Sequence, residues 1–420
     1  SISVHGDRVI RSIRPHARAA FADILSRDAV RRLIESGSIV ATTPLDHEDA
    51  PAGLAIQTDA IYEHERIPFA SYPCEWSPAM LACAAEHTLQ IALALLPQGL
   101  ILKDATPANI LFRGSSPVLV DVPSIVPRPA GQFLWYAREQ FDRCFILPLV
   151  AAARLGIPLA WTLQDTVHGL NHAQLARIAG WRRWLRPSLI GTVAIPASLG
   201  KLGSTSGVHA PRHMTNDDQA RYTLERTFRS LLATVRSLSR EIDRTATSAW
   251  QRYTQTRSHY NPEDLDRKRR FVSEMLDAHR PETVLDIGAN TGEFSKDAAR
   301  HARVVAIDTD DASVNNIFRE ARQSRHDILP LVVNFSRPTP AFGWSNVETA
   351  SFMDRCSGSF DFVLALAVIH HLRITEGIPV AEVMTELARV TRKHLLIEFV
   401  PPADPMFRQL ARGREQLYGD

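Results

Sequence analysis

Strand-like apolar runs alternate with helical patterns over residues 261–420. The apolar runs predict strands, and the amphipathic segments between them predict helices. Strands are expected at residues 283–287, 303–307, 328–333, 360–366 and 394–400, with helices near residues 292–300, 312–323, 347–355 and 380–390. This alternation is typical of an α/β domain with a parallel sheet, right-handed crossovers and helices on both faces.

The start of this domain has the composition of a helix N-terminus. Asn261 can cap a helix, Pro262 suits the first turn, and the acidic Glu263 and Asp264 suit its positive end. We therefore expect a helix to about residue 278 and a domain boundary at residue 261.

Residues 131–260 are expected to be mostly helical. Gly and Ser cluster at residues 199–211, which predicts a flexible joint. After it, apolar residues recur at alternating spacings of four and three, which places them on one stripe of a helix, here called the seam. The seam is formed by Leu224, Phe228, Leu231, Val235, Leu238 and Ile242, and Ala246, Ala249 and Tyr253 extend it. A narrow stripe of this kind packs along another helix, and an intramolecular bundle is favoured over a dimerisation helix.

Residues 1–130 mix short β-like runs at 53–58 and 118–122 with an expected helix at 78–96. Pro and Gly interrupt this region often, which favours a compact α+β domain.

Length, charge and cysteine content limit the classes of protein to which this chain can belong. The length of 420 residues suggests two or three domains, and a net charge of +2 gives no strong footprint for binding nucleic acid. The four cysteines form no CxxC pair, which favours a reduced, cytoplasmic chain. We expect no transmembrane span, because Pro97 and Pro148 interrupt apolar stretches that are already too short.

The first predicted strand of the α/β domain ends in a glycine turn. Gly288 follows the strand directly, and Gly292 stands near the start of the next helix. Glycines let the backbone turn sharply and let a ligand approach closely. Asp308 ends the second predicted strand, where a carboxylate can accept hydrogen bonds from two ribose hydroxyls.

The segment from Leu285 to Phe294, LDIGANTGEF, resembles motif I of class I methyltransferases, which have a Rossmann-like fold and bind S-adenosylmethionine. The resemblance implies cofactor contacts from several strand ends. Asp286 and the turn would hold the methionine part, Asp308 the ribose, and Asn334, after the third strand, would border the adenine. The remaining expected cofactor contacts are Gly288, Ala289, Asn290, Gly292 and Ala367.

In the same family, the segment at residues 364–372 faces the transferred methyl group. His370 is therefore a candidate general base, since histidine titrates near neutral pH. A structural role for His370 and His371 is the favoured alternative. Methyl transfer needs mainly two reacting atoms held at near-attack distance in a dry pocket.

A second motif lies near residue 104. Asp104, Asn109 and Asp121 resemble the catalytic and metal-binding loops of kinases and small-molecule phosphotransferases, which implies magnesium ligands at Asn109 and Asp121. Lys103 stands where Arg or Gly is usual, and Val122 stands where Phe is usual. These departures favour a degenerate kinase-like domain for docking, or a chance loop, over an active kinase. No other metal site is expected.

Together, these motifs resemble one methyltransferase family, described as host-specific nodulation protein-like. Class I methyltransferases have seven strands, whereas residues 401–418 suggest a loop and a helix. We therefore expect strands six and seven to be missing.

The expected reaction is methyl transfer to an unidentified acceptor, with a small molecule or lipid-linked glycan favoured. The alternatives are a protein or RNA methyltransferase and a non-catalytic cofactor-binding scaffold. Basic runs at residues 266–270 and 181–186 could contact phosphates or bases, but such runs are usually solvated. The sequence does not indicate an oligomeric state.

Overall fold

The computed structural model describes residues 2–51, 60–163, 168–181, 189–194, 213–256 and 262–400, together with Arg408 and Ala411. Several sequence predictions lie outside the described residues: the β-like run at 53–58, the joint at 199–211, the cap at Asn261 and nearly all of the segment after residue 400. The basic run at 181–186 is described only at Trp181, and the side chains of Ala246, Ala249 and Tyr253 are likewise outside the description.

The C-terminal domain contains a five-stranded parallel sheet in the order β11-β10-β9-β12-β13. Its strands are β9 (Thr283–Ile287), β10 (Arg303–Asp308), β11 (Ile328–Val332), β12 (Phe360–Ala365) and β13 (Thr391–Ile397). Each predicted strand is therefore present. Strand β13 begins three residues earlier than expected, because the charged residues Arg392 and Lys393 interrupt the apolar pattern at its start. Both side chains pair with Asp361, at 2.6 and 3.0 Å.

Helices cover both faces of this sheet, as expected for buried parallel strands. One apolar cluster joins Val272 and Leu276 of α12 with Ala298 of α13 and Ile317 of α14, and another lies against α15 and α16. The helix bounds are α12 (Pro262–His279), α13 (Glu293–Ala298), α14 (Asp311–Ser324), α15 (Phe352–Cys356) and α16 (Val380–Val390). The prediction of a helix from residue 347 was wrong, because the Ser351 side chain caps α15 by accepting the N–H of Asp354 at 3.1 Å.

The N-terminal part starts with a four-stranded antiparallel sheet in the order β1-β2-β4-β3. These strands are β1 (Ile2–His5), β2 (Arg8–Ile13), β3 (Thr42–Leu45) and β4 (Ala60–His64), with α1 (Pro15–Ser26) and α2 (Asp28–Glu35) between β2 and β3. The buried helix α3 (Pro78–Leu95) follows, and then two small pairs, β5 (Leu100–Leu102) with β8 (Ile125–Pro127) and β6 (Ile110–Arg113) with β7 (Ser116–Leu119). This α+β arrangement agrees with the sequence.

Among the described residues, only Pro78–Gln98 has the length and hydropathy of a membrane span, and 72% of its most apolar window is buried inside the molecule.

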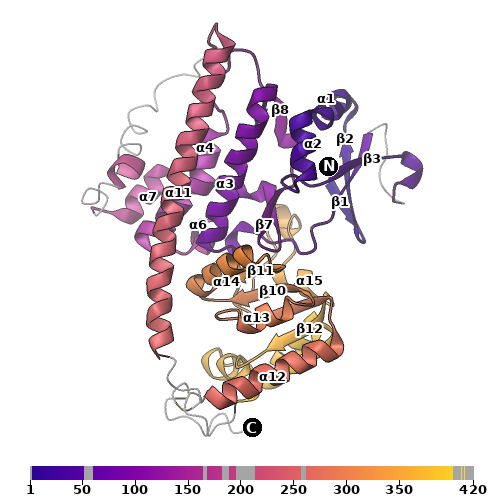
Figure 1. Ribbon diagram of the computed structural model, residues 1–420, viewed down its shortest axis with the longest axis vertical. Coiled ribbons are helices and arrows are strands. Elements are labelled where there is room, and N and C mark those ends of the chain that lie inside the picture. Colours follow the sequence, from indigo (N-terminus) through magenta and orange to yellow (C-terminus); the bar gives the residue numbers. More distant parts are fainter. Residues whose placement is uncertain are drawn as a thin grey trace.

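The middle of the chain is helical. Its described elements are α4 (Arg138–Phe141), a π-helix (Asp142–Ile146), α5 (Leu147–Val150), a second π-helix (Ala151–Leu155), α6 (Leu159–Thr162), α7 (His172–Ala179), a third π-helix (Ile190–Ala194) and α11 (Asp217–Thr256). Helix α11 runs along one side of the molecule (Figure 1), and its predicted seam is buried from Leu224 to Ile242 against α3 and α14. The seam is thus an intramolecular one.

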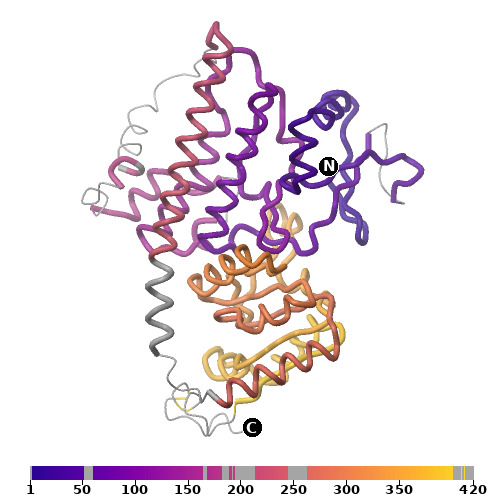
Figure 2. Tube along the Cα trace, viewed as in Figure 1, coloured from indigo at the N-terminus to yellow at the C-terminus, as the bar shows by residue number. Residues whose placement is uncertain are grey.

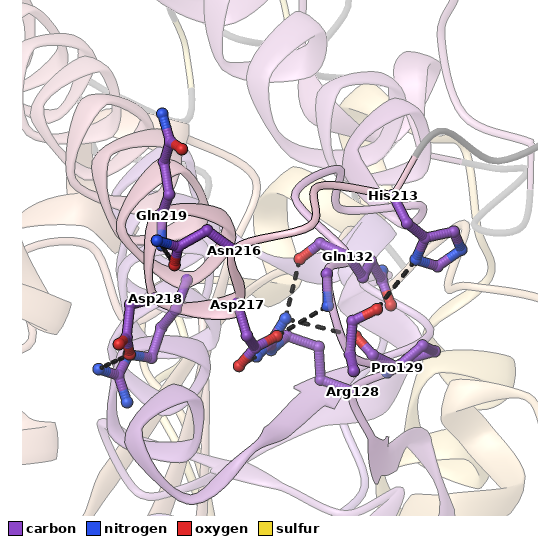
Figure 3. Close-up of polar contacts among 11 residues, drawn as sticks. Arg128, Pro129, Gln132, His213, Asn216, Asp217, Asp218 and Gln219 are labelled. Atoms are coloured by element: carbon purple, nitrogen blue, oxygen red, sulfur yellow. Dashed lines mark hydrogen bonds and ion pairs between the residues drawn. The ribbon is translucent and has the colours of Figure 1, made fainter.

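The first turn of α11 is tied to the segment after β8 (Figure 3). Asp217 accepts hydrogen bonds from Arg128 at 2.6 Å and from the N–H of Gly131 at 2.7 Å. His213 pairs with the carbonyl of Ala130 at 3.1 Å. Because the side chain of Arg128 is buried, this contact joins α11 firmly to the N-terminal part.

The N-terminal part packs directly on the parallel-sheet domain (Figures 1 and 2). The side-chain oxygen of buried Asn315, in α14, accepts the N–H of Ala79 at the start of α3 (2.9 Å). Phe112 and Phe318 meet edge to face across the same boundary, with ring centroids 5.9 Å apart. One continuous apolar cluster therefore extends through residues 1–130, 131–260 and 261–420. The domain boundaries themselves stay predictions.

Candidate functional site

The turn after β9 adopts the left-handed backbone that glycine favours. The φ angles of Gly288, Asn290 and Gly292 are 71°, 51° and 70°. The N–H groups of Gly288 and Ala289 both donate to the carbonyl of Ile307, at 2.9 Å. The turn is therefore held against the end of β10, at the carboxyl edge of the sheet, where ligands of open α/β sheets bind.

Two glycines of this turn have no room for a side chain. A Cβ on Gly288 would lie 2.7 Å from Val368, and a Cβ on Gly292 would lie 2.7 Å from Ile317 of α14. The turn thus packs between α14 and the segment after β12. This explains in atomic terms why glycine stands at both positions.

Asp308 lies directly beside this turn. Its carboxylate accepts the N–H of Asn290 at 2.7 Å and the N–H of Asp310 at 2.9 Å. Burial raises the pKa of Asp308 above its ordinary value, while these backbone hydrogen bonds act in the opposite direction. Each oxygen retains a further lone pair, so the carboxylate can still accept two hydroxyl groups.

Asn334 lies next to Asp308, because the neighbouring N–H of Val333 donates to the carbonyl of Asp308 at 2.9 Å. The side-chain oxygen of Asn334 accepts both the N–H and the hydroxyl of Ser336, at 2.9 and 2.7 Å. Since both lone pairs of this carbonyl are engaged, a contact with adenine would come from the amide nitrogen. The role of Asn334 stays a prediction.

Asp286 lies beneath the turn and is buried. Its carboxylate accepts the hydroxyl of Ser295, in α13, at 2.5 Å. Burial raises the pKa of Asp286 to about 6, although the Ser295 hydrogen bond lowers it. The carboxylate therefore links β9 to α13. Its contact with the methionine part of S-adenosylmethionine stays a prediction.

The segment after β12 closes over the same edge. Ala367 has a φ of 56°, which is unusual for a residue with a side chain and turns the chain toward Gly288. His370 is buried, with its ring centroid 4.3 Å from that of His371. Partial desolvation lowers the pKa of His371, and the charge of Asp308 opposes that change. His371 therefore lies within electrostatic range of Asp308. The role of His370 as a general base stays a prediction.

A cavity of about 340 Å³ lies between α12 and the ends of β12 and β13. It is one strand away from the turn, because Ala365 of β12 pairs with Ile287 of β9, and no residue of the turn lines it. Its walls include Leu265, Lys268, Phe271, Leu366, Glu398 and Phe399. The Lys268 ammonium lies 5.2 Å from the ring centroid of Phe294, which follows Gly292 by two residues. Sequence reasoning missed this cavity, because Lys268 stood out only as part of a basic run.

Two of the three kinase-like residues, Asn109 and Asp121, are close together in the structure. The N–H of Val120 donates to the carbonyl of Asn109 at 2.9 Å, so Asn109 lies beside the strand end that leads to Asp121. Arg11 of β2 pairs with Asp121 at 3.2 Å. Among the described residues, no group of three or more His, Cys, Asp or Glu could hold a metal ion. Magnesium binding at Asp104, Asn109 and Asp121 stays a conditional prediction.

The turn, Asp308 and the segment after β12 together fit S-adenosylmethionine. The turn offers close backbone approach, and Asp308 offers acceptors for the ribose hydroxyls. The cavity next to Leu366 leaves space on the side where the methyl group is expected.

Comparison with known proteins agrees with this geometry. A family model described as "Methyltransferase domain" matches residues 285–397, and S-adenosylmethionine is the cofactor. Nodulation protein NoeA of Rhizobium meliloti (strain 1021) is 32% identical over 422 residues, which cover 99% of this chain and 85% of that protein.

Among solved structures, the bifunctional kinase-methyltransferase WbdD is 22% identical, with a TM-score of 0.26. That match covers 34% of this chain and 30% of WbdD. The N-methyltransferase NodS from Bradyrhizobium japonicum WM9, in complex with S-adenosyl-L-homocysteine, is 18% identical, with a TM-score of 0.23, over 32% of this chain and 58% of NodS. The matches to WbdD and NodS both span less than two thirds of the protein matched.

The NoeA match extends along nearly the whole chain, and the methyltransferase model covers the strands that form the site. The chain therefore belongs to the family of nodulation protein NoeA, and it is an S-adenosylmethionine-dependent methyltransferase.

Proposed function

We propose that this enzyme transfers the methyl group of S-adenosylmethionine to a small molecule or to the sugar part of a lipid-linked glycan. The observation that carries the proposal is the 340 Å³ cavity one strand away from the cofactor turn. Its volume is at the lower end of the range of about 300–1,000 Å³ found for small-molecule sites. A cavity of this size suits one ring or a short chain.

Bound S-adenosylmethionine supplies a methyl group on a positively charged sulfonium. The chain's own residues then bind and orient the two reactants. The turn at Gly288–Gly292 and the carboxylate of Asp308 hold the donor, and the apolar walls at Leu366 and Phe271 exclude water from the acceptor. Positioning two atoms at near-attack distance can provide most of the rate. His370 acts as a base only if the acceptor must lose a proton early.

Three cations of the basic run at residues 266–270 have carboxylate partners, which argues against a nucleic-acid acceptor. Arg267 pairs with Asp264 at 3.0 Å, and Lys268 pairs with Glu398 at 2.6 Å. Arg269 pairs with Asp266 and also with Glu293. Because these cations already have carboxylate partners, they present little net positive charge to a phosphate backbone.

The test is incubation of the full chain with methyl-labelled S-adenosylmethionine and separate small-molecule, lipid, protein and RNA fractions of bacterial cells. We expect label in the small-molecule or lipid fraction. Label confined to protein or RNA would contradict the proposed acceptor. Binding of the cofactor without transfer to any fraction would favour the scaffold alternative.

We also propose a cytoplasmic location. The support is chemical, because all four cysteines are described and carry free thiols, as expected in a reducing compartment. Fractionation of cells that produce a tagged full-length chain tests this location, and recovery in the periplasm would refute it.

A further inference from the structure

The lining of the cavity between α12 and the ends of β12 and β13 contains aliphatic side chains and two aromatic rings. Leu265, Val272, Leu366 and Ile397 supply aliphatic surface. Phe271 and Phe399 also line it, yet 50% and 75% of their surfaces are exposed to solvent. Exposed aromatic rings at the mouth of a cavity are surfaces that a ligand can cover, because their burial against a ligand face is favourable.

The charged groups of this cavity compensate one another. The Lys268 ammonium lies 2.6 Å from the Glu398 carboxylate, and these side chains are only 19% and 28% exposed. Asp264 pairs with Arg267 at 3.0 Å. Among the described lining residues, a charged acceptor would meet no uncompensated counter-charge, and its entry would cost desolvation. The lining therefore favours a neutral acceptor.

The position of Glu398 places polar chemistry near the expected methyl group. The N–H of Glu398 donates to the carbonyl of Ala365 at 3.2 Å. Glu398 therefore lies beside the last residue of β12, and Ala367 follows that residue by two positions. The Glu398 carboxylate accepts one hydrogen bond from Lys268 and retains lone pairs for others. Hydroxyl groups are the neutral donors that such a carboxylate binds.

We propose that this cavity is the acceptor site, and that it binds a small, neutral, hydroxylated ring, with Phe271 and Phe399 against its apolar face and Glu398 accepting hydrogen bonds from its hydroxyls. A ring of this class has C–H groups on its faces, which match the rings of Phe271 and Phe399, and hydroxyls around its edge, which match the carboxylate of Glu398. The assignment rests on the proposed methyl transfer, since it names the acceptor class of that same site.

The proposal makes Glu398 a specificity-determining residue. In Glu398→Gln, the charge of Lys268 loses its partner, and the cavity becomes positive. Binding should then shift from neutral rings toward anionic ones. A purely structural role for Glu398 would weaken all ligands equally, so the direction of this change separates the two roles.

Saturation-transfer NMR on the full chain with bound S-adenosyl-L-homocysteine tests the site without turnover. The probes are methyl glycosides of neutral hexoses and deoxyhexoses, methyl glucuronide as the anionic ring, and methyl glucosaminide as the cationic ring. The wild-type chain should bind one or more of the neutral probes in preference to both charged ones. Phe271→Ala should weaken that binding about tenfold, which corresponds to about 1.4 kcal/mol. Glu398→Gln should raise the affinity for the glucuronide relative to the neutral ring.

Two matched variants control for surface changes. Trp344→Ala removes an aromatic ring that is 81% exposed and does not line the cavity, and Glu382→Gln alters an exposed carboxylate on α16. Both should bind the neutral ring as the wild type does. Calorimetry with S-adenosylmethionine should give the same affinity for Phe271→Ala as for the wild type.

Four outcomes would overturn the inference, the last of them together with the proposed function. The first is a chain that binds S-adenosylmethionine but prefers no neutral ring, and the second is a Phe271→Ala variant with unchanged ring affinity. Either result leaves the reaction class standing. The third is loss of S-adenosylmethionine affinity in Phe271→Ala or Glu398→Gln, which would assign the cavity to the cofactor instead. The fourth is absence of any cofactor binding by the wild type, which would overturn both this inference and the proposed function.

Discussion

Arg355→Met is expected to destabilise the whole molecule, because Arg355 joins the N-terminal part to the parallel-sheet domain. Its guanidinium donates to both carboxylate oxygens of Glu75 and to the carbonyl of Ala70. It also lies over the ring of Tyr72, 4.3 Å from the centroid. Glu75 is fully buried, and only 8% of the Arg355 side chain is exposed.

The magnitude follows from what the substitution leaves behind. In Arg355→Met, the Glu75 carboxylate keeps the hydrogen bond from the N–H of Tyr72, at 3.0 Å, and stays out of water. Breaking a buried ion pair on one side typically costs about 3–5 kcal/mol. Since whole proteins are stable by about 5–15 kcal/mol, this is a large fraction of the total. The double variant Glu75→Leu with Arg355→Met should recover at least about 2 kcal/mol of the loss, because no charge is then buried alone.

Urea unfolding at neutral pH measures this effect through tryptophan fluorescence, to which the buried Trp76, next to Glu75 in the chain, contributes. Arg229→Met is the matched control, because Arg229 forms an exposed pair with Glu225 and such pairs contribute little. A loss below about 1 kcal/mol in Arg355→Met, or a double variant as unstable as the sum of its single variants, would refute the reasoning.

Three further predictions concern the cofactor site. Asp308→Asn should weaken S-adenosylmethionine binding about 10- to 100-fold, because charged hydrogen bonds to the ribose are lost, and calorimetry showing unchanged affinity would contradict that role. Gly292→Ala should lower thermal stability and cofactor affinity more than Gly358→Ala. Both glycines have positive φ, but only a Cβ at residue 292 would meet another side chain, Ile317, at 2.7 Å. Equal effects of the two substitutions would rule out the contact with Ile317. Asp286 has a pKa raised by burial from 3.8 to about 6, so its contribution to stability is present below pH 3.8 and lost as pH rises through 6. Asp286→Asn should therefore gain stability relative to the wild type as pH increases from about 4 to 7. The measurement is the melting temperature of both proteins across this pH range. A constant difference between the two would show that Asp286 does not titrate as expected.

The sequence predicted the C-terminal fold closely because four of its five strands, β9 to β12, are mostly buried. Buried strands are continuous apolar runs, and β9 begins and ends at the residues that the pattern indicated. The N-terminal hairpin of β1 and β2 was missed. Its strands are short and partly exposed, with Ile2 and Val4 more than half exposed, so their apolar residues do not form a long run.

The cofactor turn and Asp308 were found from sequence because local backbone chemistry requires them. Glycine is needed where φ is positive, and the acid comes at the end of the next strand. The cavity was not found. Lys268 and Glu398 are 130 residues apart along the chain, and no local pattern indicates that they pair.

The sequence by itself indicated the reaction class, because residues 285–294 resemble motif I of class I methyltransferases and Asp308 stands at the end of the next predicted strand. Only the tertiary structure decided how α12 and the end of β13 enclose a cavity, and how Glu75 meets Arg355. Those contacts join residues far apart in the chain. They depend on packing between whole elements, which the order of polar and apolar positions in one segment does not specify.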